Sequence, residues 1–298
     1  MKILSAFLLA GLVLPSSGAA MDRDVVISAY QARCEDGDFD ANLATARQAV
    51  REALARGSQF LVLPETFLSG YTSPEAMRRG ARRLDDPQVR AFIAESAEHE
   101  MVVIVGIARI TEEGIYNTAL VIHRGRLLGT YDKIMLTGGD RRSLGFLPGK
   151  EMPVFEAHGA RFAVIICHDS SFPHPAMIAK LRGAELLFSP HYNDINPNTM
   201  DAHRKWVRNC HIGLACQMRM VVVRANVVAK DKKGLGYGDS FIVSPRGEML
   251  AEAALFRAEM ITATITGALF KSPYVWADLK EVPLAIRSML ADLLLKEQ

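Results

Sequence analysis

Apolar segments of strand length alternate with amphipathic segments of helical spacing along most of this sequence. Residues 25–30 and 60–63 are short, largely apolar runs, and Pro64 stops the second one. Between them, residues 41–56 carry apolar side chains at helical spacing and are followed by Gly57, a residue type that commonly ends helices. Repeated alternation of strands and helices predicts a layered α/β fold.

The same alternation continues to residue 265 without an internal repeat or an interdomain linker. Further helices are expected at residues 87–100, at residues 201–218 and near Pro173. Further strands are expected at residues 101–107, 117–123, 126–131, 162–166, 186–188, 220–228 and 259–265, with a hairpin turn at 245–247. A chain of 298 residues, 49% of them apolar, can bury a large core. We therefore expect one domain over residues 21–270.

The charges and the metal-ligand residue types are dispersed along the chain. The net charge is +2, from 35 basic and 33 acidic residues without a long block of one sign, which disfavours nucleic acid as a partner. The four cysteines form no C-x-x-C pair and the eight histidines are scattered, so we expect neither a metal site nor a disulfide scaffold. Cys210 and Cys216 are predicted to be core residues.

The first twenty residues differ from the rest of the chain. Lys2 precedes an apolar run at 3–14, Pro15 breaks that run, and the small residues 16–20 follow. These are the three parts of a secretory signal peptide, and the run is shorter than the ~20 residues that a transmembrane helix needs. We therefore expect a secreted or periplasmic protein with no stable membrane span. The alternative is that translation starts at Met21, which would leave the protein in the cytoplasm.

Three reactive residue types stand next to predicted strands. Glu65 follows the strand that Pro64 ends, Lys133 lies among strand-like apolar residues, and Cys167 closes a buried strand before a turn and a helix. Each has an ordinary explanation, since most glutamates and lysines are solvated and many free cysteines are buried apolar residues. The position of Cys167 nevertheless favours a nucleophile, because N–H groups at a helix start stabilise a thiolate and an oxyanion.

Together these segments resemble the nitrilase (carbon–nitrogen hydrolase) superfamily, in particular its amidase-like branch. The resemblance covers about residues 25–265. Seven stretches carry it in the family's order: LPETFLSGY (63–71), YNTALVI (116–122), GTYDKIML (129–136), FLPG (146–149), CHDSSFP (167–173), GAELLFSP (183–190) and YGDSFIVSPRGE (237–248). It implies a four-layer α-β-β-α sandwich that assembles into a homodimer or a larger homo-oligomer.

The resemblance also implies a mechanism that needs no cofactor. Glu65 matches the family's general base, Lys133 its lysine and Cys167 its nucleophile. The Lys133 ammonium and the backbone N–H of His168 would hold the oxyanion of a tetrahedral intermediate, and a thioester would follow. The implied reaction is hydrolysis of a small linear amide or N-carbamoyl compound, with release of ammonia or an amine.

The residues after the nucleophile favour an amide over a nitrile. His168 and Asp169 follow Cys167, as in the amidase branches, whereas true nitrilases usually carry Trp-Glu there. Three alternatives remain open: a nitrilase that acts on a nitrile, an acyltransferase with an amine acceptor, and a catalytically inactive homologue that binds a metabolite.

The sequence departs from the family at one acidic position. Many members carry a glutamate six residues before the proline of the F-x-P-G stretch; counting back from Pro148 gives Arg142, and the nearest acid is Asp140. Either Asp140 replaces the glutamate or the fourth acidic group is absent. Arg142 would then recognise an acidic group of the substrate or face solvent, as arginines usually do.

Two further groups of residues are candidates for contacts with ligands or partners. Residues that follow strand ends are expected to line the pocket, although each could be an ordinary loop residue: Tyr71, His191, Tyr192 and Asn193. The tail at 271–298 lies outside the α/β alternation and is expected at a dimer interface. It contains a predicted amphipathic helix at 284–295, whose apolar face is formed by Leu284, Ile286, Met289, Leu290 and Leu293.

Overall fold

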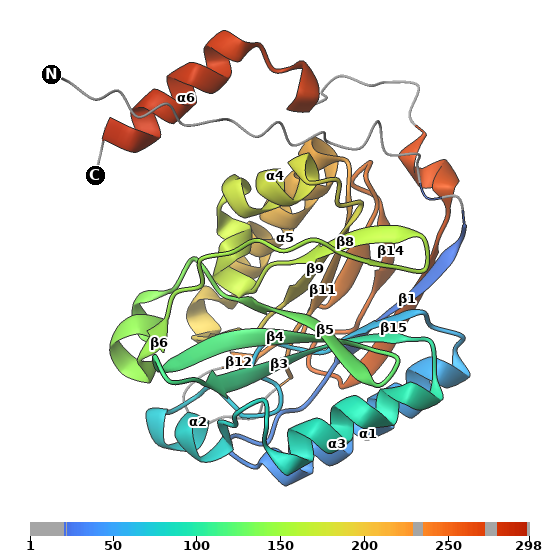
Figure 1. The fold of residues 1–298 in the computed structure, drawn as a ribbon, viewed down its shortest axis with the longest axis vertical. Coiled ribbons are helices and arrows are strands. Elements are labelled where there is room, and N and C mark those ends of the chain that lie inside the picture. The colour runs from blue at the N-terminus through green and yellow to red at the C-terminus, as the bar shows by residue number, and fades with distance from the viewer. Residues whose placement is uncertain (1–20, 22, 229–234, 272–278, 297–298) are drawn as a thin grey trace, which may run out of the picture.

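Two β-sheets packed face to face form the centre of the molecule, and helices cover the outer face of each (Figure 1). The computed structural model describes residues 21, 23–228, 235–271 and 279–296. This arrangement is the four-layer α-β-β-α sandwich that the sequence resemblance implies. Within the described ranges, no helix is both long enough and apolar enough to cross a membrane.

The first sheet contains seven strands in the order β15-β1-β2-β3-β4-β5, with β6 beside β4. The strands β1, β2 and β3 run parallel, and the other neighbours on that path are antiparallel. Their bounds are β1 Val25–Gln31, β2 Phe60–Val62, β3 Val102–Ile110, β4 Ile115–His123, β5 Arg126–Asp132, β6 Phe146–Leu147 and β15 Glu259–Ile265.

The second sheet contains six strands in the order β14-β13-β11-β9-β8-β7, of which β8, β9 and β11 are parallel. Their bounds are β7 Phe155–Ala157, β8 Ala160–Val164, β9 Leu186–Pro190, β11 Val221–Ala225, β13 Phe241–Val243 and β14 Met249–Glu252. A separate pair of short strands, β10 (Asp194–Ile195) and β12 (Leu235–Gly236), follows β9 and β11 in sequence.

Helices from the two halves of the chain cover opposite outer faces. In Figure 1, α1 (Phe39–Ala55) and α3 (Pro87–Glu95) lie below the first sheet, and α4 (Pro173–Leu181) and α5 (Met200–Met218) lie against the second. The short helix α2 (Pro74–Gly80) packs near β3. The C-terminal helix α6 (Leu284–Lys296) lies beyond α4 at the edge of the molecule (Figure 1).

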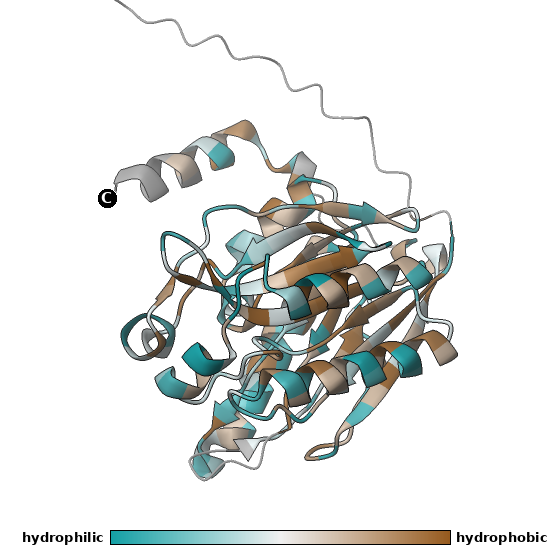
Figure 2. Cartoon of the chain, turned by 60° about the horizontal axis from the view of Figure 1, so that its bottom comes forward, coloured by the Kyte–Doolittle hydropathy of each residue, from teal (hydrophilic) through white to brown (hydrophobic). Residues whose placement is uncertain are grey.

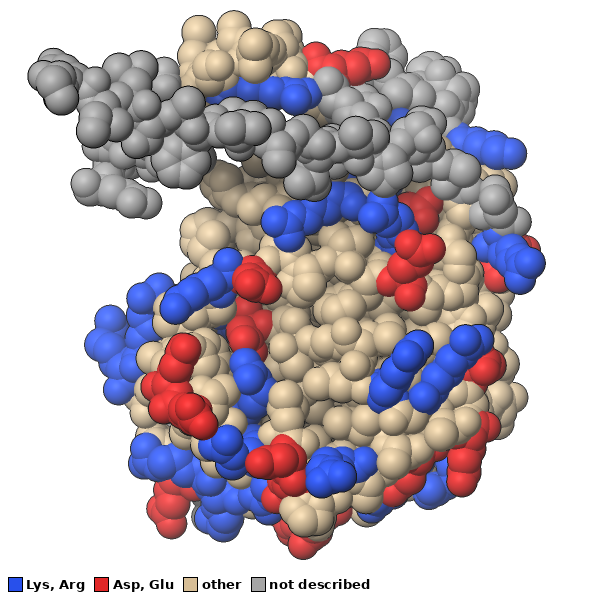
Figure 3. Space-filling model, viewed as in Figure 1, with Lys and Arg blue, Asp and Glu red and all other residues tan. Residues whose placement is uncertain are grey.

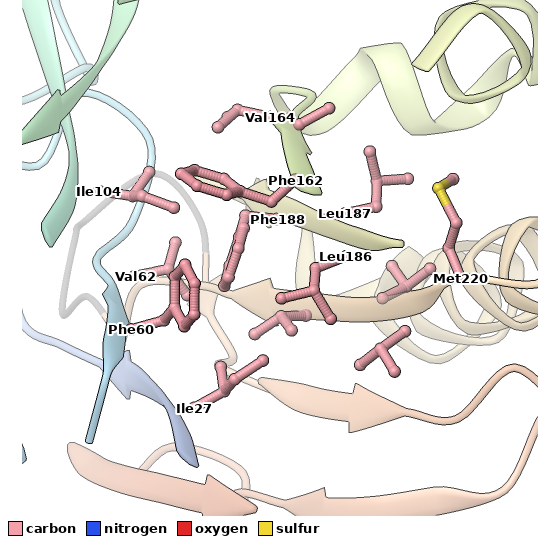
Figure 4. Close-up of a cluster of buried hydrophobic side chains, with 14 of the residues drawn as sticks. Ile27, Phe60, Val62, Ile104, Phe162, Val164, Leu186, Leu187, Phe188 and Met220 are labelled. Atoms are coloured by element: carbon pink, nitrogen blue, oxygen red, sulfur yellow. The ribbon is translucent and has the colours of Figure 1, made fainter. Parts of the chain in front are cut away.

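Strand β2 is apolar at every position because both of its faces are buried. Phe60 and Val62 belong to the core cluster that joins the two sheets, whereas Leu61 belongs to the cluster beneath α1 and α3. Figure 4 shows Phe60 beside Phe188 and Phe162, with ring centroids 5.6 and 5.3 Å away. Because side chains alternate between the faces of a strand and both faces are covered, neither face is left for polar residues. Figure 2 shows the same contrast between largely apolar strands and mixed helices.

The predicted elements are present with shifted ends, and one core prediction is wrong. The helix expected at 87–100 is α3 followed by a 3₁₀ turn at Ser96–Glu98, and α2 was not anticipated. Cys216 is exposed and Cys210 is partly exposed, so the prediction that both lie in the core is incorrect. The buried stripe of α5 takes other positions at helical spacing: Val207, His211, Leu214, Ala215 and Met218.

Basic and acidic side chains are interspersed on the face of the molecule that Figure 3 shows. This distribution matches the near balance of 35 basic and 33 acidic residues in the sequence. Exposed apolar side chains also occur on α6, where Leu284 is 78%, Ile286 52% and Met289 59% exposed. The apolar face predicted for the tail is therefore uncovered in the single chain at these three positions.

Candidate active site

Glu65, Lys133 and Cys167, which are far apart in the sequence, form one cluster at the ends of their strands. Glu65 follows β2, Lys133 directly follows β5, and Cys167 follows β8 after two extended residues. The Nζ of Lys133 lies 2.7 Å from the Oε1 of Glu65, and both side chains are fully buried. The fold therefore brings together a carboxylate, an ammonium and a thiol from both sheets.

The Glu65 carboxylate is held by three donors. Lys133 and the Nδ2 of Asn117 each donate to Oε1 at 2.7 Å, and the backbone N–H of Tyr192 donates to Oε2 at 2.8 Å. Burial raises the pKa of the Glu65 carboxyl above its ordinary value, although Lys133 and Asn117 favour its ionised form. A carboxylate in this state can accept a proton more readily than a solvated one.

The turn that carries Glu65 packs directly on β3 at a glycine. A Cβ on Gly106 would lie 2.2 Å from the backbone N of Thr66 and 2.5 Å from the carbonyl O of Pro64. Thr66 itself has a positive φ of 44°, which non-glycine residues seldom adopt. The position of Glu65 thus depends on close contact between two backbones, which only glycine permits.

Asp140 forms a second ion pair with Lys133. Its Oδ2 lies 2.9 Å from Nζ and accepts the N–H and Oγ1–H of Thr137, and its Oδ1 accepts the Tyr71 hydroxyl at 2.8 Å. Burial alone would raise the pKa of the Asp140 carboxyl, but Lys133 and these donors hold it below its ordinary value. A second acidic group is therefore present beside Lys133 and is Asp140, the first residue of a π-helical turn that spans Asp140–Leu144.

Arg142 lies on the same turn with an exposed side chain. The turn directs Asp140 inward and Arg142 outward, over Gly138. Of the two sequence alternatives at this position, the structure therefore places the acid, and not the arginine, against Lys133.

Cys167 occupies a strained backbone position at the start of a 3₁₀ turn. Its φ is 46°, and the turn at Cys167–Ser171 runs into α4. Residues in this region of φ/ψ space are often functional. Burial and the nearby Glu65 carboxylate raise the pKa of the Cys167 thiol to about 12. The group is therefore a thiol at neutral pH and needs a base to become a nucleophile.

Asp169 connects the nucleophile turn to the segment that carries Lys133. Its Oδ1 accepts the N–H of Met135 at 2.7 Å, and its Oδ2 accepts the Tyr131 hydroxyl at 2.7 Å and the N–H of Ile166 at 2.8 Å. The side chain is fully buried. These bonds fix the two segments relative to each other.

The predicted pocket residues take different roles in the geometry. The Tyr71 ring lies 5.2 Å from the Tyr192 ring, and the Nζ of Lys133 lies 5.9 Å from the centre of Tyr71. Tyr192 faces Glu65 with its backbone, while its side chain belongs to the cluster beneath α1. His168 is partly buried and packs edge-on against Phe172.

Asn193 approaches the nucleophile directly. Its Nδ2 donates to the Sγ of Cys167 at 3.4 Å, and its Oδ1 accepts a hydrogen bond from Arg224 at 2.6 Å. His191 lies beside it, with its Nδ1 3.2 Å from the Oδ1 of Asn193. Sequence reasoning missed both Arg224 and Asn117; the available signals were an arginine inside the apolar run of β11 and an asparagine inside β4.

The family of the chain follows from comparison with known proteins. The carbon–nitrogen hydrolase family model matches residues 26–272. The chain is 31% identical over 250 residues to an N-carbamoylputrescine amidase of Arabidopsis thaliana, covering 78% of this chain and 83% of the relative. It is 30% identical over 230 residues to a nitrilase of Pyrococcus abyssi, covering 76% and 84%.

A solved structure extends the likeness in fold. It is a variant of the amidase from Nesterenkonia sp. AN1, with the acetamide moiety of fluoroacetamide added covalently at its active-site cysteine. The TM-score is 0.71 at 20% identity, over 92% of this chain and 99% of that one. The fold and the sequence together define a carbon–nitrogen hydrolase. This chain belongs to that family, with the nitrilase superfamily's sandwich and amidase-like relatives.

Proposed function

We propose that this enzyme hydrolyses the carbon–nitrogen bond of a small linear amide or N-carbamoyl compound through a thioester on Cys167. One observation carries the proposal: the Glu65 carboxylate and the Lys133 ammonium form a fully buried pair at 2.7 Å beside the partly buried thiol of Cys167. A buried pair is a costly arrangement for stability alone, and these three groups suffice for nucleophilic acyl transfer.

In the acylation half of the reaction, Glu65 accepts the proton of the Cys167 thiol while Sγ attacks the carbonyl carbon. The carbonyl oxygen becomes an oxyanion, which the backbone N–H of His168 and the Lys133 ammonium stabilise. The carbon–nitrogen bond then breaks as Glu65 returns its proton to the leaving nitrogen. The products are a thioester on Cys167 and free ammonia or amine.

In the deacylation half, Glu65 takes a proton from water, whose oxygen attacks the thioester carbon. The carbon–sulfur bond breaks as Glu65 passes that proton to the sulfur, and the carboxylic acid leaves. Asp140 supports both halves, because a second carboxylate 2.9 Å from Lys133 keeps that lysine charged. Burial opposes the charged form of Lys133, but Glu65 and Asp140 among its neighbours hold its pKa well above the ordinary value.

An amide is preferred to a nitrile because His168 and Asp169 follow the nucleophile and because the donors suit a tetrahedral oxyanion. Tyr71, Asn193 and His191 are proposed to line the substrate pocket. Arg142 is proposed as a contact for a carboxylate on acidic substrates, because an exposed guanidinium two residues from Asp140 is free to bind one.

The test is release of ammonia by the purified protein from matched amides, N-carbamoyl amino acids and nitriles that share an acyl group. Amide or carbamoyl turnover that disappears in Cys167→Ala is the expected result. Nitrile turnover equal to or faster than amide turnover would instead identify a nitrilase. Acyl transfer to added hydroxylamine in preference to water would identify an acyltransferase, and inactivity on every substrate would favour a binding homologue.

We also propose that the mature chain begins at Met21, after removal of a leader that exports the protein from the cytoplasm. The leader itself, at residues 1–20, lies outside the described residues. Met21 is buried at 4% exposure, and its backbone N donates to the Oε1 of Glu185 at 3.0 Å. An α-ammonium at that atom would form a charge-assisted bond with the half-buried carboxylate.

N-terminal sequencing of the protein from its native host tests the cleavage site, and an intact Met1 would reject it. A second test compares the loss of thermal stability on Glu185→Gln in chains that begin at Met1 and at Met21. The loss should be larger in the shorter chain, which carries the α-ammonium.

Assembly into a homodimer or larger oligomer is proposed from the tail. Leu284, Ile286 and Met289 expose apolar surface on α6 in the single chain, and a partner subunit would cover it. Light scattering at micromolar concentration should give at least twice the mass of a single chain, which is 32.8 kDa for the full 298 residues and lower once residues 1–20 are removed. A monomer at that concentration would reject the proposal.

A further inference from the structure

Arg224 is a fully buried arginine on β11, behind the candidate nucleophile. Its Nη1 donates to the backbone carbonyls of Gly238 and Asp239, and its Nη2 donates to the Oδ1 of Asn193 at 2.6 Å and the Tyr237 hydroxyl at 3.3 Å. The Asn193 carboxamide is thereby fixed in one orientation, because an arginine can only donate. That orientation leaves the Nδ2 of Asn193 facing the Sγ of Cys167 at 3.4 Å.

The charge of Arg224 has no carboxylate partner among the ion pairs of the described residues. The nearby Asp239 carboxylate pairs with Arg204 and Arg208 instead, at 2.9 and 2.6 Å, and meets Arg224 only through its main-chain oxygen. The Nε of Arg224 is buried without a hydrogen-bond partner. A guanidinium buried in this way is costly unless a negative charge nearby offsets it.

The balance of charge around the thiol supplies that offset. The Glu65 and Asp140 carboxylates face a single ammonium, that of Lys133, so this buried group carries one net negative charge. The positive charge of Arg224 acts on the Cys167 thiol beside this group and lowers the pKa of that thiol. When the Cys167 proton moves to Glu65, the negative charge moves from a carboxylate that Lys133 holds to a sulfur that Asn193 contacts. Asn193 links that sulfur to Arg224, so the guanidinium lies on the side of the site where the sulfur becomes negatively charged.

We propose that Arg224 is a positioning residue for the nucleophile. It holds the Asn193 carboxamide so that its NH₂ group faces the sulfur, and its positive charge stabilises the thiolate left when Glu65 takes the proton. This inference rests on the proposed function, since it assumes that Cys167 is the nucleophile. It adds a residue outside the Glu65, Lys133 and Asp140 cluster to the machinery.

The experiment measures alkylation of Cys167 by iodoacetamide in the full-length protein as a function of pH, with peptide mass spectrometry to separate the cysteines. Arg224→Met keeps the length of the side chain and removes its charge and donors. We expect the rate at Cys167 to fall about tenfold to a hundredfold at neutral pH and the pH needed to reach a given rate to rise, because one unit of thiol pKa changes the thiolate fraction tenfold. Arg224→Lys keeps the charge and should recover part of the rate.

Two controls separate a local effect from general disturbance. Exposed Cys216 should be alkylated at the same rate in every variant. Arg204→Met removes another arginine of the same region, whose side chain is 34% exposed and whose partner Asp239 keeps Arg208; the Cys167 rate should stay within about twofold of the wild type, far below the tenfold of one pKa unit.

If Arg224→Met does not fold, Asn193→Ala tests the proposed role of Arg224. The proposal requires this variant to slow alkylation of Cys167 about tenfold, the effect of one unit of pKa, and to make the rate insensitive to Arg224→Lys. Alkylation of Cys167 at the wild-type rate across the pH range in Arg224→Met, or in Asn193→Ala, would overturn the role of Arg224. Failure of the proposed function is a separate result: it would appear as undiminished amide turnover in Cys167→Ala.

Discussion

The contact between Gly106 and the Glu65 turn offers a test of the catalytic geometry that changes no catalytic side chain. Gly106→Ala adds one methyl group at the middle of β3. That carbon would lie 2.2 Å from the N of Thr66, whereas ordinary contacts begin near 3.4 Å. All three of its nearest neighbours are backbone atoms of residues 64–66, so no side chain can rotate to make room.

The expected loss of activity follows from the distance by which this contact is too short, about 1.2 Å, the difference between 2.2 and 3.4 Å. Because β3 pairs with β4 along nearly its whole length and with β2 at its first three residues, the Glu65 turn moves more easily than the strand. A displacement of about 1 Å at a catalytic group can reduce the rate about 100-fold. We therefore expect kcat to fall about 100-fold, with a stability loss of about 1–3 kcal/mol from overpacking.

The assay compares amide turnover, measured as released ammonia, with thermal unfolding of the same preparation, well below the melting temperature. Gly213→Ala is the matched control, because a Cβ there has no neighbour within 4 Å and the residue lies inside α5. It should retain full activity and gain up to about 1 kcal/mol in helix stability. Wild-type kcat in a folded Gly106→Ala protein would refute the claim that this close contact positions Glu65.

Four further predictions concern the cluster and the neighbouring Arg142. Glu65→Gln and Lys133→Ala should each reduce acylation by several orders of magnitude, and the double variant should be little worse than either, because both serve one step; losses that multiply would indicate independent roles. Asp140→Asn should reduce kcat about 100-fold for every substrate, since a buried charged hydrogen bond contributes about 3 kcal/mol. Arg142→Ala should raise KM for acidic amides only, and an equal loss of kcat in both variants would contradict the separate roles. Because burial raises the pKa of Glu65 and the base must be ionised, kcat/KM should decline on the acid side at a pH above ~4.3, the ordinary glutamate value. An acid limb at or below that value in the pH profile would show that Glu65 is not the limiting group.

The positions of the strands were predictable from the sequence, but their order in the sheets was not. Apolar runs bounded by proline, glycine and polar residues predicted where β1, β2, β3 and β4 lie, because a strand covered on both faces excludes polar side chains. The order of these strands in the sheets, with β15 beside β1 and β6 beside β4, came only from the structure. Pairing between distant segments depends on which faces fit together, and the periodicity of a single segment does not indicate its partner strand.

The candidate site residues divide along the same line. The resemblance to one family over seven stretches singled out Glu65, Lys133 and Cys167 as candidates, whereas placement at a strand end favoured a role for Cys167 alone. The choice between Asp140 and Arg142 was open in the sequence, since an irregular π-helical turn has no repeat from which a side chain's direction follows. Arg224 was missed because an arginine in an apolar run shows neither what it contacts nor what charge it offsets. Those properties depend on carboxylates, carbonyls, the Asn193 carboxamide and a thiol from five separate segments, which become neighbours only when the two sheets pack.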